Sequence, residues 1–252
     1  MKSALPPKLP DVLLRPPCGR VLVIAPHPDD ETMGLGGTLA LHAAAGDHIT
    51  ALFVGSGIQG DPDGFYPRAD YPHIRAEEAA AAARVLGIAE LKFLGYPDNL
   101  DDEGIHVFGN LPADPAEARK ALASSFAELL AGLIAPERFT IVYYPWEGEL
   151  HADHWQVSLG VQHLIATRPD LVERMDFLGY DVWSALPPDT VIDISDVMPQ
   201  KLSAVKCYAS QLMYQDYEHA VMGLDAYRSL LLERGASYGE AFVGRYRARS
   251  AE

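Results

Sequence analysis

The sequence predicts an α/β protein with a mostly parallel sheet and helices on both of its faces. Val21 to Ala25 is a run of five apolar residues without alternation, which is typical of a strand covered on both sides. Short apolar runs then alternate with longer Ala- and Leu-rich segments at helical spacing along most of the 252-residue chain. This alternation predicts right-handed βαβ units.

Apolar patterns and turn residues define the expected elements in chain order. The predicted strands are 21–25, 49–54, 91–94, 139–144, 175–183 and 190–194. The predicted helices are 32–45, 74–86, 115–135, 154–166, 197–208 and 218–234. A Leu-Pro-Pro-Asp turn joins the last two strands, which predicts a hairpin or an edge addition to the sheet.

Two further segments are expected to line a pocket. Residues 55–73 are rich in Gly, Pro and Asp, and a loop of this length in a compact domain is often a binding loop. Residues 201–215 are Tyr-rich and too polar for a core.

We expect a single domain over residues 20–252, preceded by an extended arm over residues 1–19. The arm contains five prolines and little periodicity. No linker, repeat or low-complexity tract divides the rest. A content of 48% apolar and 22% charged residues suits a globular protein with a substantial core.

Charge and composition exclude several classes of partner. The net charge of -15 argues against nucleic-acid binding, which depends on basic surface. The chain shows neither a signal-peptide core nor an apolar run long enough to span a membrane. Cys18 and Cys207 form no CxxC or zinc-finger pattern, so both are expected to be thiols in a reducing compartment. The expected location is cytoplasmic.

A polar cluster follows the first strand. His27, Asp29, Asp30 and Glu31 stand just after Pro26, at the point where ligands bind in open α/β sheets. The alternative is that the acids serve only as a helix cap, a task that one Asp would fulfil. Capping leaves His27 and the clustering of three acids unexplained. Adjacent carboxylates repel unless a cation relieves them, and His with Asp suits a divalent metal such as zinc.

A second cluster follows the strand over residues 139–144. His151 and His154 flank Asp153 in the sequence HADH, and their spacing allows both imidazoles to face one site. His27 and Asp30 with one of these two histidines supply the three ligands of a catalytic zinc site. Zinc lowers the pKa of its water, so a carboxylate that is not a ligand, Asp29, is the candidate general base. The other histidine would donate to the oxyanion or protonate the leaving amine of an amide or ester.

The two motifs together resemble the PIG-L (LmbE-like) family of zinc-dependent N-deacetylases. Its patterns are [A/P]HPDDE and HxDH, matched here by residues 26–31 and 151–154. Weaker family features recur in order at residues 34–38, 75–87, 95–100, 201–211 and 239–242. The resemblance implies a Rossmann-like three-layer sandwich and removal of an acyl group from the 2-amino group of a glucosamine conjugate. Members often form homo-oligomers.

The resemblance also implies roles for individual residues. His27, Asp30 and His154 would bind Zn²⁺, although Fe²⁺, Mn²⁺ or Co²⁺ also suits such a site. Asp29 would be the general base and His151 would stabilise the tetrahedral intermediate. The remaining assignments are Asp153 as the group that orients His151, and Arg75 and Asp98 as substrate contacts.

One position departs from the family. Some thiol-biosynthesis members carry a Tyr two residues before the first His of HxDH, where this chain has Glu149. The difference favours another amino-sugar conjugate as the small-molecule substrate. Trp146 and Glu149 are expected at the pocket edge, with ordinary packing as the alternative for Trp146.

Three rival functions remain to be weighed. A metal-dependent amidase acting on a thiol conjugate or an N-acyl amino acid would use the same site. A non-catalytic carbohydrate-binding module would leave the ligands and base without a task. A dinucleotide-binding protein is disfavoured, because three acids precede the Gly-rich helix where a pyrophosphate would bind.

Overall fold

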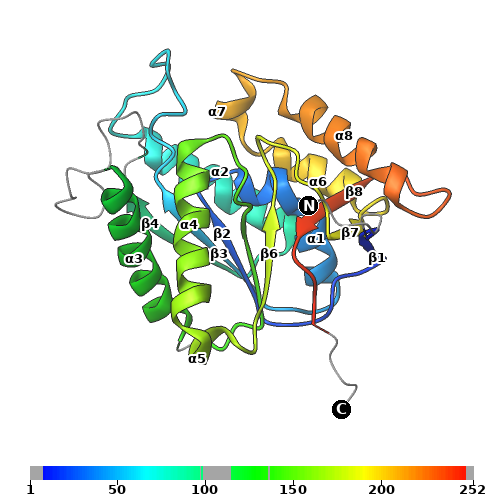
Figure 1. Cartoon of the computed structure of the whole chain (residues 1–252). Helices are drawn as coiled ribbons and strands as arrows, with labels where there is room; N and C mark the ends of the chain where they lie inside the picture. Colours follow the sequence, from blue (N-terminus) through cyan, green and yellow to red (C-terminus); the bar gives the residue numbers. More distant parts are fainter. Residues whose placement is uncertain (1–7, 97, 99–114, 136, 248–252) are drawn as a thin grey trace.

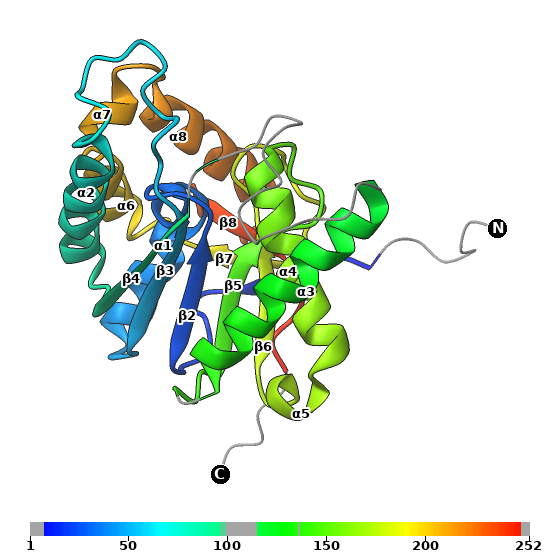
Figure 2. The ribbon, with the colours of Figure 1, turned by 90° about the vertical axis from the view of Figure 1, so that its left-hand side faces the viewer.

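The computed structural model describes residues 8–96, 98, 115–135 and 137–247. They form one eight-stranded sheet between two layers of helices (Figure 1 and Figure 2). The strands are β1 Asp11–Leu13, β2 Val21–Ala25, β3 Ile49–Gly55, β4 Glu90–Tyr96, β5 Ile141–Pro145, β6 Asp176–Tyr180, β7 Thr190–Asp193 and β8 Gly239–Val243. The helices are α1 Asp30–Ala44, α2 Tyr71–Leu86, α3 Pro115–Ile134, α4 Ala152–Thr167, α5 Pro169–Val172, α6 Met198–Val205, α7 Ala209–Leu212 and α8 Tyr217–Arg228, followed by the 3₁₀ turn η1 Ser229–Leu231.

The strand order is β1-β7-β8-β6-β5-β2-β3-β4, and every pairing except those of β8 is parallel. One core cluster packs α1, α2 and α6 on one face, and a second packs α3 and α4 on the other (Figure 2). β2 lies between them and is buried over its whole length. The predicted α/β sandwich with a mostly parallel sheet is confirmed.

Of the two arrangements expected for the last two predicted strands, a hairpin or an edge addition, the hairpin is wrong; β7 lies next to the edge strand β1. β8 lies between β6 and β7 and pairs antiparallel with both, so β6 and β7 never meet. Asp181 explains why the connection is not a tight turn. Its buried carboxylate accepts bonds from the amide of Leu186 and the guanidinium of Arg228 on α8, which hold a wide loop in place of a turn. The strand that fills the gap was noted in the sequence only as a short motif.

Helix α1 consists of two helical segments joined at Leu35, whose φ of -148° and ψ of 24° are not helical. The amides of Gly37 and Thr38 open the second segment and donate to the carboxylate of Glu240 on β8 at 2.8 and 2.6 Å. Lys201 of α6 is completely buried and donates to the same carboxylate at 2.7 Å. A buried carboxylate therefore caps the second segment, as the positive end of a helix favours.

Among the helices of the described ranges, none combines the length and apolarity that crossing a membrane requires. The carboxyl ends of the parallel strands all point toward one rim of the sheet. The loop over residues 56–70 and helix α7 stand together above this rim (Figure 1). The side chain of Gln211 joins them by donating to the carbonyl of Gly60 at 3.1 Å.

Two helical glycines provide a matched test of the packing between α3 and α4. A Cβ at Gly160 of α4 would lie 2.3 Å from Phe126 of α3, whereas a Cβ at Gly132 of α3 would have no neighbour within 4 Å. We expect Gly160→Ala to lower the free energy of unfolding by about 1–3 kcal/mol through overpacking. Gly132→Ala should raise it by about 0.5–1 kcal/mol because Ala favours a helix. Urea unfolding measures both, and equal effects would contradict the packing described.

Candidate functional site

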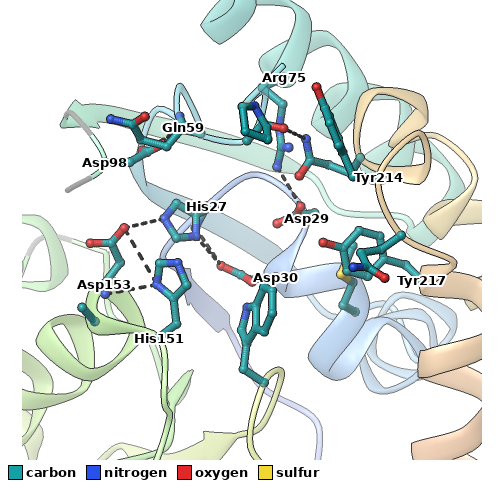
Figure 3. A pocket seen from close by; sticks show the side chains of 18 of the residues that line it. His27, Asp29, Asp30, Gln59, Arg75, Asp98, His151, Asp153, Tyr214 and Tyr217 are labelled. Carbon is teal, nitrogen blue, oxygen red and sulfur yellow. Dashed lines mark hydrogen bonds and ion pairs between the residues drawn. The ribbon is translucent and has the colours of Figure 1, made fainter. Parts of the chain in front are cut away.

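A cavity of about 710 Å³ opens at this rim and brings the two predicted clusters together (Figure 3). His27 and Asp29 come from the turn after β2 and Asp30 from the start of α1, while His151 precedes α4 and Asp153 lies in its first turn. The loop after β3 supplies Gly57, Gln59, Gly60 and Pro62, which confirms its prediction as a pocket wall. The 201–215 segment supplies Gln211, Tyr214 and Gln215.

Asp29 has an unusual backbone conformation. Its φ of 149° lies in a region that residues with a side chain rarely adopt, and its side chain makes no capping bond to α1. The simple helix-cap interpretation of the acids is therefore wrong for Asp29. Its carbonyl accepts from the amides of Thr32 and Met33, and its own amide donates to Glu31 at 3.2 Å. Strain of this kind is typical of functional sites.

Asp30 lies between two imidazoles. Its Oδ2 is 3.3 Å from Nδ1 of His27 and 3.2 Å from Nε2 of His154. His154 is completely buried, and within the described ranges neither of its ring nitrogens has a partner with hydrogen-bond geometry. Ligand atoms about 2.0–2.1 Å from a tetrahedral zinc are roughly 3.3 Å apart. The donor chemistry and the spacing therefore suit a divalent cation at the centre of this group.

His151 completes a group of three histidines that can hold a metal, with ring nitrogens all within 4.8 Å of one another. Its Nδ1 accepts the backbone amide of Asp153 at 3.2 Å. The neutral ring must then carry its proton on Nε2. At 37% side-chain exposure, His151 is the most accessible of the three.

Two carboxylates contact the ring nitrogens of His27 and His154. Neither has the role that was predicted for it. Asp153 contacts Nε2 of His27 at 2.8 Å, while Nδ1 of His151 is 4.0 Å away, so the carboxylate orients His27 rather than His151. Glu149 is buried and lies 3.4 Å from Nδ1 of His154. It also accepts the backbone amides of Val182 and Trp183. Glu149 therefore does not line the cavity, which corrects its assignment as a substrate contact.

The remaining predicted substrate residues have mixed outcomes. Arg75 lines the cavity but is buried, and its guanidinium bonds Asp29 Oδ2 at 2.8 Å and the carbonyl of Pro28. Asp98 lines the cavity and accepts the amides of Gly57 and Gln59 at 2.8 and 2.9 Å, so it also fixes the loop. Trp146 donates to the carbonyl of Ser184 and packs in a small core, which corrects its placement at the pocket edge.

Burial and neighbouring charges shift the protonation of these groups. Burial, assisted by Asp30 and opposed mainly by Arg75, raises the pKa of Asp29 to about 6. Burial also disfavours the charge on Asp30, but His154 and His27 outweigh it and hold the pKa of Asp30 below its ordinary value. Burial opposes the charge on His154, yet Asp30 and Glu149 raise the pKa of this imidazole to about 9. A cation that binds here must displace protons from the imidazoles, so its affinity for the site falls as the pH is lowered.

Glu31 and Tyr208 form a buried hydrogen-bonded pair beneath Asp29 that the sequence pattern does not reveal. The carboxylate of Glu31 is completely buried and accepts the hydroxyl of Tyr208 and that of Thr32, both at 2.5 Å. Its other oxygen accepts the strained amide of Asp29. The Tyr-rich composition of 201–215 was the available signal, but no spacing indicates which tyrosine turns inward.

The chain is similar in sequence to known de-N-acetylases. A sequence model of the family described as GlcNAc-PI de-N-acetylase (PIG-L) matches residues 22–165. A probable N-acetyl-α-D-glucosaminyl L-malate deacetylase 2 of Bacillus cereus is 30% identical over 216 residues, which cover 82% of this chain and 90% of that protein. The diacetylchitobiose deacetylase of Thermococcus kodakarensis is 29% identical over 203 residues, covering 76% and 70% of the two chains.

The structural comparison gives the same fold. N,N'-diacetylchitobiose deacetylase from Pyrococcus horikoshii, solved with its inhibitor MPG, aligns with a TM-score of 0.70 at 22% identity. The alignment covers 89% of this chain and 82% of that one.

Tyr208→Phe tests the support beneath Asp29. Burial raises the pKa of Glu31 to about 7, above its ordinary 4.5, so the stability that Glu31 contributes is present below pH 4.5 and is lost as the pH rises through 7. Removing the Tyr208 donor withdraws a bond from the carboxylate and should cost about 1–3 kcal/mol in the free energy of unfolding. We expect a larger cost at pH 8 than at pH 5 in urea unfolding. Tyr227→Phe is the control, since Tyr227 is 66% exposed; equal costs at both pH values would contradict the pairing.

Proposed function

The chain belongs to the PIG-L family of de-N-acetylases, and we propose that it hydrolyses the N-acetyl amide of an N-acetylglucosamine-type conjugate with a divalent cation and Asp29. The observation that carries the proposal is the position of Asp30 Oδ2, 3.2 and 3.3 Å from one nitrogen each of His154 and His27. Asp29 stands beside this group in the cavity wall.

His27, Asp30 and His154 are the proposed ligands. Asp30 Oδ2 lies 3.3 Å from a ring nitrogen of His27 and 3.2 Å from one of His154, the spacing expected of atoms that share a tetrahedral ion. His151 is the more exposed imidazole and lines the cavity, where an acyl group would enter. When bound, the cation lowers the pKa of water and polarises the acyl carbonyl. Zinc is the proposed metal, and iron, manganese or cobalt would also suit mixed His and carboxylate ligands.

Asp29 is the proposed general base. It takes a proton from the attacking water as the oxygen bonds to the acyl carbon, and it returns that proton to the nitrogen as the C–N bond breaks. The products are acetate and a free amine. Arg75 holds Asp29 Oδ2 at 2.8 Å and its charge favours the carboxylate.

His151 is the proposed donor to the oxyanion. Because Nδ1 accepts the amide of Asp153, the neutral imidazole presents Nε2–H. Burial and the neighbouring His27 and His154 lower the pKa of His151, which favours this neutral form. A fixed donor of this kind stabilises charge that develops in the transition state.

The names of the relatives support the proposed substrate class. They act on diacetylchitobiose and, with a probable assignment, on an N-acetylglucosaminyl malate. An amidase of thiol conjugates or N-acyl amino acids would use the same residues and is separated only by substrate tests. A carbohydrate-binding module would bind such sugars without releasing acetate. Assembly into a homo-oligomer and a cytoplasmic location stay predictions.

Asp29→Asn is the decisive variant. It keeps the shape of the side chain but cannot accept the proton, so acetate release should fall about 10²–10⁴-fold. Metal content, measured by elemental analysis, should stay equal to that of the wild type because Asp29 is not a proposed ligand. His27→Ala and His154→Ala should lose both metal and activity. Full activity of Asp29→Asn would refute the general-base role. The mechanism would be refuted if the wild-type protein contained no divalent metal and chelators left its acetate release unchanged.

Arg75→Gln separates support of Asp29 from substrate binding. Asp29 must be deprotonated to act, so kcat/KM should fall as the pH drops through about 6. A bound cation adds positive charge and shifts this fall to a lower pH. Loss of the guanidinium removes an interaction that lowers the pKa of Asp29. The acid limb of the pH profile should therefore move up by about one unit. Arg75→Lys is the control that retains the charge; a raised KM with an unmoved acid limb would assign Arg75 to the substrate instead.

A further inference from the structure

We infer that the outer part of the cavity is a subsite for a neutral, hydroxyl-rich ring, such as a second sugar or a cyclitol, and that it discriminates against an anionic aglycone. The inference rests on the proposed function and adds the chemistry of the group attached to the amino sugar. Three features of the cavity carry it: its charge, its aromatic rim and its amide side chains.

The described lining of the cavity offers no available cation to an anionic aglycone. Among the described residues that line it, Arg75 is the only Lys or Arg. Arg75 is 1% exposed and its Nη2 is already bonded to Asp29 and to the carbonyl of Pro28. A carboxylate on the aglycone would have to compete with Asp29 for this guanidinium.

The fixed charge of the lining is negative. Among the described lining residues four carry carboxylates: Asp29, Asp30, Asp98 and Asp153. Against them stand the guanidinium of Arg75 and, when bound, a divalent cation, which leaves one negative charge. An aglycone carboxylate would therefore be desolvated beside like charges, which costs affinity.

Aromatic faces flank the entrance instead. Trp183 is 56% exposed and lines the cavity, with its indole centroid 5.9 Å from that of His151. Its backbone is fixed, since its amide donates to both oxygens of Glu149. Tyr214 and Tyr217 lie across the cavity from His151 and Asp153 (Figure 3). The hydroxyl of Tyr214 is held by Asp61.

This combination matches a saccharide ring. The apolar faces of Trp and Tyr pack against the C–H groups of such a ring, while its hydroxyls need donors and acceptors at the edge. Gln59 and Gln215 provide amides on the cavity wall. A volume of about 710 Å³ lies in the upper half of the usual range for ligand pockets, about 300–1,000 Å³, and leaves room beyond one amino sugar.

The test compares kcat/KM for acetate release from four probes. N-acetylglucosamine has no aglycone, and N,N'-diacetylchitobiose carries a second sugar. The α-linked inositol and L-malate conjugates of N-acetylglucosamine form a matched pair, because they share the linkage and differ in the charge of the aglycone. We expect the inositol conjugate to exceed the malate conjugate at least tenfold, and at least one neutral conjugate to exceed the monosaccharide fivefold. Comparison of N,N'-diacetylchitobiose with the inositol conjugate shows whether the subsite prefers a sugar or a cyclitol. A malate conjugate that is equal or better overturns the inference.

Variants locate the discrimination. Trp183→Ala and Tyr214→Ala should each lower the ratio of kcat/KM for the favoured neutral conjugate to that for the monosaccharide at least threefold. The ratio cancels any effect that Trp183 has on chemistry through His151. Tyr227→Ala, on the exposed face of α8 and outside the cavity lining, should leave the ratio unchanged. Gln215→Arg should raise kcat/KM for the malate conjugate at least fivefold relative to the inositol conjugate. Unchanged ratios in all three cavity variants overturn the inference.

The two proposals fail in different ways. If wild-type protein with metal releases acetate from none of the probes, the proposed function fails. The subsite is then tested by binding alone, with calorimetry of the inositol and malate conjugates on Asp29→Asn. Tighter binding of the neutral conjugate upholds the subsite, and equal or tighter binding of the malate conjugate overturns it. If acetate is released without preference for a neutral aglycone, only the subsite fails.

Discussion

Three consecutive carboxylates, on Asp29, Asp30 and Glu31, are buried at the end of the central strand β2. Carboxylates without solvent are costly unless each has a partner of its own. The structure meets this constraint with three different partners: a guanidinium for the first, two imidazoles for the second and hydroxyls for the third. The partner then decides the chemistry. The same side-chain type becomes a candidate base, a candidate metal ligand and a support within three residues.

The partners arrive from elements that are distant in sequence, so the fold and the site depend on each other. Arg75 lies on α2, Tyr208 between α6 and α7, and His154 on α4. Each of these helices is held in turn by packing or by buried charge, as Lys201 and Glu240 show for α6, β8 and the second segment of α1. A displacement of any one of these elements would take a partner from a buried carboxylate. The cost of that lost interaction helps to fix the arrangement.

Much of this could be read from the sequence, and the remainder has a common physical cause. The buried strand β2, the alternation of elements and the meeting of the two polar clusters follow from local patterns and from the geometry of parallel sheets. Local patterns do not reveal the insertion of β8 or the true partners of Asp153, Glu149 and Arg75. These features depend on pairings between segments up to about 200 residues apart. A carboxylate that accepts a backbone amide leaves no periodic pattern in the sequence.

The charged side chains at the centre of the site are paired with one another, which limits what they can contribute to substrate recognition. A guanidinium bonded to Asp29 and imidazoles grouped around Asp30 serve the chemistry at the amide and are not available to read the rest of a substrate. Recognition beyond the amide must therefore come from groups without compensating duties. In the described cavity these are the rings of Trp183, Tyr214 and Tyr217 and the side-chain amides of Gln59 and Gln215. They stand on loops and at the start of α8, where sequence can change without disturbing the buried charges, so the same centre can serve different conjugates.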